Sequence, residues 1–226
     1  MPESKSNEAT DGRGRGRPAL TVQELEDGRQ HILAVARSLF QKDGYDAVTI
    51  RKIMEHTSRS PMMFYRYFSN KRAVIRYIWA DILAAFFEHC TKSIASIQSP
   101  ELRLEAFLRA AIHFWLERPD DFRILYLNQD RLESDEDSYF AHEPEGYEQS
   151  AIIDELLLDW NPEMANQDLQ LARQYIIINM LGISFSLIVL PELPWKPAST
   201  LIDETINSIF LWLNSQVSKD GSIDTQ

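Results

Sequence analysis

Apolar residues recur at three- and four-residue intervals in one segment after another between Thr21 and Val217, which is the spacing of a helix face. The pattern is longest in residues 70–96, 166–190 and 199–217. No run of alternating apolar and polar residues is long enough for a sheet, and no segment repeats another. The sequence therefore predicts an all-α protein.

Residues that start and stop helices divide this pattern into separate elements. Thr21 and Glu24 form a capping box, and Gly44 ends the helix that follows. A serine followed by proline, at Ser60-Pro61 and Ser99-Pro100, is a strong start signal. The predicted helices are Thr21 to Gly44, Thr49 to the turn at Thr57, Pro61 to about Tyr67, Asn70 to about Ser96, Ser99 to about Trp115, Pro119 to about Leu125, Tyr147 to Trp160, Asn166 to Leu190 and about Ser199 to Val217, with a long loop at residues 133–146. Because residues 166–190 are apolar almost all round, we expect this helix to be buried on most sides.

Charge divides the chain into two unlike parts. Residues 1–79 hold 14 Lys and Arg against 9 Asp and Glu, whereas residues 80–226 hold 9 against 25. A basic amino end on an acidic body favours a polyanion such as nucleic acid as the partner of that end. The polar start predicts no secretory signal, and the apolar run 175–190 is too short and too often interrupted for a membrane span. We expect a cytoplasmic protein with no membrane partner.

Sequence motifs of enzymes and metal sites are missing. The single cysteine, Cys90, excludes an intramolecular disulfide framework and a multi-cysteine metal site. The five histidines form no His-Glu-x-x-His motif, and none follows a glutamate by three residues as in di-iron bundles. The segment 182–186 resembles a nucleophile elbow, but it lacks the final glycine and lies within a predicted helix. We therefore expect no catalytic residues, no metal and no cofactor.

Three short helices between residues 21 and 68, with a tight turn before the third, are typical of a helix-turn-helix DNA-binding domain. The helix after the turn would lie in the major groove, with phosphate contacts at its start and flanks. Apolar atoms on its exposed face can contact thymine methyl groups. The candidate phosphate contacts are Ser60, Tyr65, Arg66 and Lys71, with Thr49 and Arg51 on the neighbouring backbone, and the candidate base contacts are Pro61, Met62 and Met63.

The spacing of small residues, aromatic residues and one lysine in this region is shared with a known family. The residues that share this spacing are Ile32-Leu33, Ala36, Leu39-Phe40, Gly44, Thr49, Ile53, Ser60, Phe64-Tyr65, Tyr67-Phe68 and Lys71. Together they resemble the DNA-binding domain of the tetracycline-repressor (TetR) family over residues 29–76. The resemblance implies a homodimer that binds a palindromic operator in double-stranded DNA. It also implies a carboxyl-terminal domain that binds a small-molecule effector, and phosphate contacts by Thr49, Tyr65 and Lys71.

The chain departs from the family pattern in the turn. Thr57, Ser58 and Arg59 stand where the family usually has alanine, glycine and valine, and Met54 replaces a common alanine. Because the family's valine packs inward, we expect Arg59 either to reach a phosphate, as a further DNA contact, or to alter the turn.

The amino-terminal tail offers a second DNA contact. Arg15-Gly16-Arg17-Pro18 resembles the core of an AT-hook, in which Arg15 and Arg17 would enter a narrow A/T-rich minor groove. Alternatively, the tail is a flexible basic arm that binds phosphates without selecting sequence. The expected organisation is a disordered basic tail (1–20), a helix-turn-helix domain (21–70), an effector-binding and dimerisation domain (71–218) and a flexible tail (219–226).

Aromatic residues of the acidic domain are candidates for an effector pocket. Phe86, Phe107, Trp115 and Tyr126 either line a pocket for an apolar effector or form an ordinary core, and Cys90 is either a thiol sensor or a small buried hydrophobe.

The last two long helices are expected to pair with their copies in a four-helix dimer interface, which places two reading helices about 34–36 Å apart. The predicted function is a transcription regulator, most simply a repressor that the effector releases from DNA. The alternative is an adaptor of the same fold that acts mainly through a protein partner.

Overall fold

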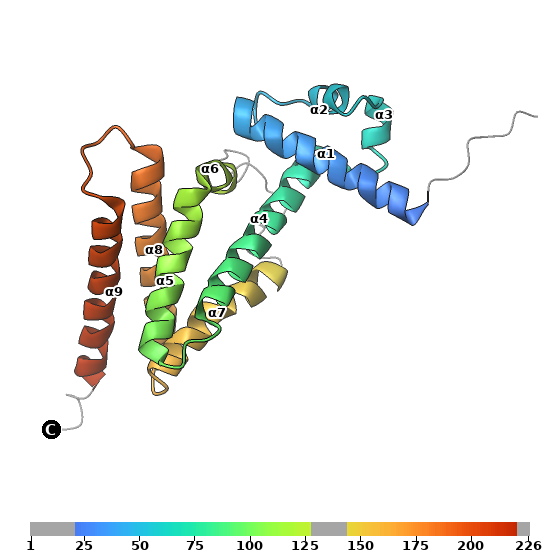
Figure 1. Ribbon diagram of the computed structural model, residues 1–226. Helices are drawn as coiled ribbons and strands as arrows, with labels where there is room; N and C mark the ends of the chain where they lie inside the picture. Colours follow the sequence, from blue (N-terminus) through green and yellow to red (C-terminus); the bar gives the residue numbers. More distant parts are fainter. Residues whose placement is uncertain (1–20, 128–143, 221–226) are drawn as a thin grey trace, which may run out of the picture.

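A computed structural model of the protein describes residues 21–127 and 144–220, and within these ranges all regular structure is helical, as predicted (Figure 1). The helices are α1 (Val22–Asp43), α2 (Ile50–His56), α3 (Pro61–Phe64), α4 (Lys71–Ile94), α5 (Pro100–Glu117), α6 (Pro119–Tyr126), α7 (Pro144–Trp160), α8 (Asn166–Val189) and α9 (Ala198–Asp220).

The predicted caps explain where several helices begin. Thr21 and Glu24 form the capping box: Thr21 Oγ1 accepts a hydrogen bond from the Glu24 amide at 3.2 Å, and the Glu24 carboxylate accepts one from the Thr21 amide at 2.8 Å. The Asn70 side chain caps α4 by accepting a hydrogen bond from the Ala73 amide at 2.8 Å. Gly44 ends α1 with a positive φ of 79°, which glycine adopts without strain.

Three predicted boundaries are wrong. The third helix ends at Phe64 rather than near Tyr67, because the chain tightens there and the Tyr67 amide bonds to the Phe64 carbonyl at 2.9 Å. Helix α7 begins at Pro144, which is suited to the first turn because it needs no amide hydrogen, so residues 144–146 of the expected loop are helical. Helix α9 continues through residues 219 and 220 of the expected tail. The rest of that loop, the expected amino-terminal tail and residues 221–226 lie outside the described residues.

Figure 1 shows α1, α2 and α3 as a small unit at one end of α4, and α5 packs along the rest of α4. Helices α7, α8 and α9 pack against α5 and complete a bundle. The small unit encloses the buried side chains of Ile32, Phe40, Ile53 and Phe64. The bundle encloses those of Leu104, Phe107, Leu157, Ile176 and Ile206.

Helix α6 fastens the small unit to the bundle. Asp121 of α6, only 7% exposed, accepts hydrogen bonds from Arg37 of α1 at 2.6 Å and from Gln41 at 3.2 Å. The indole of Trp79 in α4 donates to the Ile124 carbonyl of α6 at 3.0 Å. Helix α6 is therefore bonded to both α1 and α4.

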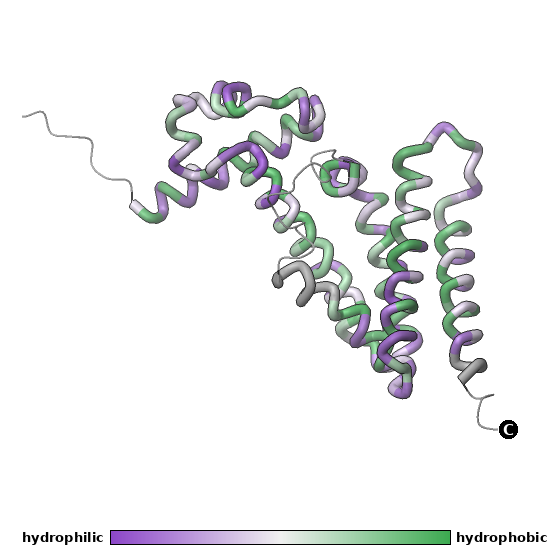
Figure 2. Tube along the Cα trace, turned by 180° about the vertical axis from the view of Figure 1, so that it is seen from behind, coloured by the Kyte–Doolittle hydropathy of each residue, from purple (hydrophilic) through white to green (hydrophobic). Residues whose placement is uncertain are grey.

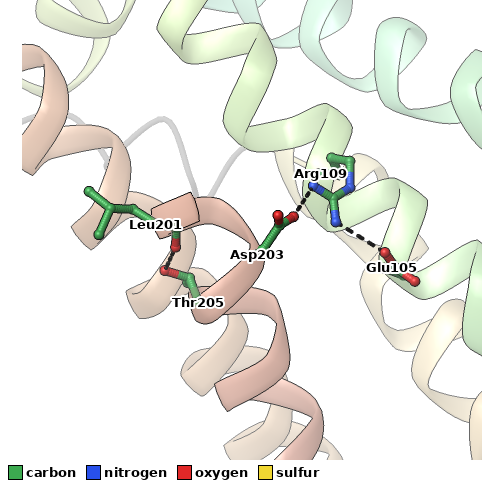
Figure 3. Close-up of polar contacts among 5 residues, drawn as sticks. All are labelled: Glu105, Arg109, Leu201, Asp203 and Thr205. Atoms are coloured by element: carbon green, nitrogen blue, oxygen red, sulfur yellow. Dashed lines mark hydrogen bonds and ion pairs between the residues drawn. The ribbon is translucent and has the colours of Figure 1, made fainter. Parts of the chain in front are cut away.

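Ion pairs hold the bundle helices to α5. Arg109 of α5 bonds to Asp203 of α9 at 2.6 Å and to Glu105 of its own helix at 3.1 Å (Figure 3). The hydrogen bond that Arg109 donates to the Asp203 carboxylate contributes most to raising the pKa of Arg109. Arg103 pairs with Asp159 of α7 in the same way, at 2.5 Å. Helix α5 is therefore joined to α7 and α9 by charge as well as by apolar packing.

The expectation that α8 is buried on most sides is wrong for the single chain. Its buried residues are Ala172, Ile176, Met180, Ser184 and Ile188, a single stripe at four-residue spacing. On another side Ile178 is 68% exposed. Figure 2 shows that the first turns of α8 are hydrophilic and the remainder is largely hydrophobic. By length and composition alone α8 would pass for a membrane span, as the core helices of many soluble proteins do.

Candidate nucleic-acid interface

The turn between α2 and α3 is short and sharply bent. Helix α2 ends at His56, and the buried hydroxyl of its C-cap residue, Thr57, donates to the Met54 carbonyl at 2.9 Å. Ser58 follows with φ = 55°, the left-handed conformation that favours glycine. The Arg59 amide then bonds back to the Met54 carbonyl at 3.3 Å. These contacts set the direction in which α3 leaves the turn.

Helix α3 and the turn after it expose one face. Pro61, Met62, Tyr65 and Arg66 are exposed, in two pairs four residues apart, and Met62 is 82% exposed. The opposite face carries Phe64 and Phe68, whose buried rings lie 5.5 Å apart. Met63, predicted to contact bases, is instead half-buried and packs against the hydrophobic core. The face available to a groove is therefore formed by Pro61, Met62, Tyr65 and Arg66.

The predicted phosphate contacts lie around this face. Thr49 caps α2, where its hydroxyl accepts a hydrogen bond from the Lys52 amide at 3.2 Å. Ser60 precedes α3 and is exposed, and its hydroxyl makes no cap hydrogen bond. Arg51 is largely exposed and pairs with Glu55 at 2.8 Å, which raises the pKa of Arg51. These side chains can exchange solvent or a surface partner for a phosphate at little cost.

Lys71, at the first turn of α4, is less free than the sequence indicated. Its ammonium group donates to the Tyr45 carbonyl at 3.0 Å and lies 3.8 Å from the centre of the Tyr45 ring. These contacts bring the start of α4 against the connection between α1 and α2. If Lys71 contacts a phosphate, its ammonium group does so from this position beside Tyr45.

Arg59 takes an arrangement that the sequence did not predict. Its guanidinium donates to the Tyr67 hydroxyl at 3.4 Å, and both groups lie over Gly28 of α1. A Cβ atom at Gly28 would be 2.4 Å from the Tyr67 hydroxyl oxygen, so with any other residue at this position the side chains of Tyr67 and Arg59 would have to shift. Arg59 therefore packs back on α1 in this structure. Arg15 and Arg17 of the predicted tail contact lie outside the described residues.

The predicted pocket residues are close together in the interior. The rings of Phe86 and Trp115 are stacked with centres 5.0 Å apart, and Tyr126 meets Trp115 edge-on at 5.4 Å. Phe107 is fully buried, and Tyr126 is half-buried. This packing favours the core alternative for each ring. A pocket at this position stays a prediction.

Cys90 is a buried hydrophobe in this structure. Its side chain is 0% exposed, and burial raises the pKa of the thiol to about 12. A reactive cysteine needs an accessible thiolate, which this environment disfavours. The sensor alternative is therefore not supported.

Two parts of the molecule were missed by the sequence analysis. One is the α1–α6 contact, because Arg37 and Asp121 are 84 positions apart and neither belongs to a recognisable motif. The other is a contact between α1 and α4, in which the guanidinium of Arg29 lies 4.9 Å from the centre of the Tyr77 ring. No sequence signal marks either contact.

Comparison with known proteins gives a family match and a set of structural relatives. Residues 32–78 match the model of the tetR family of bacterial regulatory proteins. No curated protein matches the chain significantly.

Solved structures that are similar to this chain include three regulators. A TetR/AcrR-family transcriptional regulator from Thermobifida fusca YX-ER1 has 20% identity and a TM-score of 0.57, with 81% of this chain and 96% of that one covered. The regulator FadR from Bacillus subtilis, in complex with stearoyl-CoA, has 15% identity and a TM-score of 0.61, with 80% and 96% covered. The ketosteroid regulator KstR2 of Mycobacterium tuberculosis has 16% identity and a TM-score of 0.53, with 83% and 94% covered. At these identities the likeness shows the fold alone.

Proposed function

Because the match over residues 32–78 makes this chain a member of the tetR family of bacterial regulatory proteins, we propose that it is a homodimeric repressor that leaves a palindromic operator when a small apolar effector binds. Membership makes it a DNA-binding transcription regulator and not an enzyme. The observation that supports the DNA contact best is the exposed face of α3, with Met62 82% exposed beside Tyr65 at 63%. Large apolar side chains left in solvent at this position suit a base-reading role.

In the complex with DNA, some residues of this face contact bases and others contact phosphates. Pro61 and Met62 contact base edges, and Met63 contributes only the part of its side chain that is not packed against the core. The phosphate contacts come from Ser60, Tyr65 and Arg66, which flank α3, from Thr49 and Arg51 at the start of α2, and from Lys71 on α4. Arg59 supports the turn or rotates outward to a phosphate, and Arg15 and Arg17 of the tail extend the contact to the adjacent minor groove.

The dimer forms through α8 and α9. Leu171, Ile178 and Phe185 of α8 are exposed and follow one another at seven-residue intervals, which places them on one side of the helix. Leu211 of α9 is 72% exposed. A second copy of the same helices would cover these side chains in a four-helix interface. This interface also accounts for the apolar composition of α8 without a membrane, and it supports a soluble, cytoplasmic protein.

The effector acts from the bundle. The Bacillus subtilis relative was solved with stearoyl-CoA, whose acyl chain is apolar, and this supports an apolar effector for the present chain. The effector would bind between the side chains of Phe86, Phe107, Trp115 and Tyr126, which would have to move apart. If the effector prefers a conformation in which α6 and α4 are displaced, the bonds from Asp121 to Arg37 and from Trp79 to Ile124 carry that displacement to the reading helix.

The experiment that tests the DNA contact is selection of bound sequences from random duplex DNA with the purified full-length protein. We expect a palindrome whose half-sites are separated by about one helical turn. If no motif is recovered and binding disappears at modest salt, the basic end binds DNA only electrostatically. That outcome would favour the adaptor alternative.

Variants separate the two kinds of contact. Lys71→Ala weakens binding to all sequences and lowers the salt slope by about one, because one phosphate contact is lost. Met62→Ala instead changes the preferred sequence at one position of each half-site. Lys92→Ala is the matched control, because Lys92 is exposed near the far end of α4 and pairs with Glu88. If Met62→Ala leaves both affinity and preference unchanged, α3 does not enter the groove in this orientation.

A further inference from the structure

Helix α8 has a glycine in its interior, Gly182, that the packing of the single chain does not require. Gly182 is exposed, and a Cβ atom added to it would have no heavy atom of the described residues within 4 Å, apart from its chain neighbours and its own helix turn. Its φ is not positive, so the backbone there suits any residue. Because glycine destabilises a helix interior relative to alanine, this position weakens α8 and no contact within one chain explains it.

Gly182 lies on the one side of α8 that the bundle leaves uncovered. Helix α8 packs on α5, α7 and α9, and its buried stripe includes Met180 and Ser184. At about 100° per residue, Gly182 is about 160° from both of them around the helix, so it faces away from the bundle. Ile178 and Phe185, four residues before it and three after it, are exposed on the same side. The glycine is therefore flanked by large apolar side chains in solvent.

The polar side chains beside Gly182 are hydrogen-bonded within α8. The Asn179 amide donates to the Tyr175 carbonyl at 2.8 Å, and the Ser186 hydroxyl donates to the Gly182 carbonyl at 2.8 Å. Because these donors already have partners, covering this side of α8 would leave neither of them unsatisfied.

Charge indicates which partner fits this side of α8. Residues 174–191 contain no Asp, Glu, Lys or Arg, whereas residues 80–226 as a whole hold 25 acidic residues against 9 basic ones. Copies that met through other parts of the bundle would bring like charges together, but this side can meet its own copy without repulsion. A second copy of α8 is therefore the partner that charge favours.

We propose that α8 of one copy crosses α8 of a second copy at Gly182, with the two glycines in contact on the two-fold axis. Without Cβ atoms the two backbones approach more closely than the roughly 8–10 Å between helix axes that larger side chains impose. Ile178 and Phe185 pack on either side of the crossing. Gly182 is thus the residue that sets the distance between the two copies. This inference rests on the proposed dimer, which involves α8 and α9 but does not include a point of closest contact.

Cross-linking of the full-length protein tests the crossing point. Two cysteines form a disulfide when their Cα atoms are about 4.4–6.8 Å apart. Gly182→Cys should therefore give a covalent dimer on oxidation with diamide, measured by denaturing electrophoresis without reductant. The matched control is Leu171→Cys, exposed on the same side but about 16 Å away along the helix, and it should not cross-link. The wild type should not cross-link either, because Cys90 is 0% exposed.

A bulky substitution tests the close approach of the helices. In analytical ultracentrifugation, Gly182→Leu should raise the Kd of the dimer by about tenfold or more, although leucine favours the helix within each chain. Thr91→Leu, at an exposed position of α4, is the control and should leave the Kd unchanged.

Three results would overturn the crossing while the proposed dimer stands. They are a dimeric protein in which Gly182→Cys does not cross-link, one in which Leu171→Cys cross-links as readily, and one in which Gly182→Leu leaves the Kd unchanged. A monomeric wild type would overturn both the crossing and the proposed dimer.

Discussion

Replacing Ser58 by glycine tests the backbone strain in the turn that aims α3. Among the residues that the structure describes, Ser58 is the one non-glycine residue with a positive φ, at 55°. This conformation costs an L-residue about 1–2 kcal/mol. Glycine removes this cost, but it also gives the unfolded chain more freedom, which returns about 0.5–1 kcal/mol. We therefore expect Ser58→Gly to raise the free energy of unfolding by about 0.5–1 kcal/mol.

The assay is urea unfolding followed by circular dichroism, at one protein concentration for all variants because dimerisation contributes to the measured stability. Ser208→Gly is the matched control. Ser208 is exposed in the interior of α9 with its hydroxyl bonded to the Glu204 carbonyl at 2.8 Å, so glycine there should lower the free energy of unfolding by about 0.5 kcal/mol. The same substitution is thus expected to have opposite signs at the two positions.

If Ser58→Gly is neutral or destabilising while Ser208→Gly behaves as expected, the reasoning is refuted. The serine side chain would then supply a contact worth more than the strain. In that case the angle between α2 and α3 would depend on the side chain and not on the backbone.

Three further variants or measurements test other parts of the structure. Asp121→Ala should lower the free energy of unfolding by about 1–2 kcal/mol, since it removes the buried partner of Arg37, whereas Asp120→Ala at its exposed neighbour should cost less than about 0.5 kcal/mol in the same urea assay. Ile178→Glu should convert the dimer to monomers, as measured by size-exclusion chromatography with light scattering. The control is Leu158→Glu on α7, where Leu158 is 39% exposed, and it should leave the dimer intact. If both variants behave alike, the proposed interface is contradicted. With its thiol pKa near 12, Cys90 should have about one part in ten thousand as thiolate at pH 8, so a thiol reagent should label it only after unfolding; rapid labelling of the native protein would contradict its burial.

Local signals predicted most of the helix boundaries because caps act within one turn. Thr21 with Glu24, Thr49 and Asn70 each satisfy backbone amides that are at most three residues away. The end of α3 was missed because the shortening after Phe64 depends on burying Phe64 and Phe68 on the same side, which is a tertiary effect.

The positions of functional side chains were less predictable than the helices that carry them. Lys71 bonds to a carbonyl 26 residues earlier, and Arg59 lies over a glycine of α1 that makes room for it. Met63 is adjacent to Met62 in sequence, yet it faces the core because successive helix residues point about 100° apart. The sequence identifies which residues are candidates for DNA contact, whereas packing between helices decides which of them are exposed.

The way α4 and α6 share contacts with the amino-terminal unit limits how regulators of this kind can exchange their DNA-binding domains. A recombinant joined at residue 70 would separate α1 from Val74 and Ile75, which are fully buried at the start of α4. The family match itself continues to residue 78, past both of them. A functional chimera therefore needs a junction beyond Val74 and Ile75. It also needs the pair that joins α1 to α6: an arginine at position 37 in the protein that supplies the amino-terminal unit, and an acidic residue at position 121 in the protein that supplies the bundle. In this chain the amino-terminal unit and the bundle therefore form a matched pair of surfaces, and one cannot be exchanged without the other.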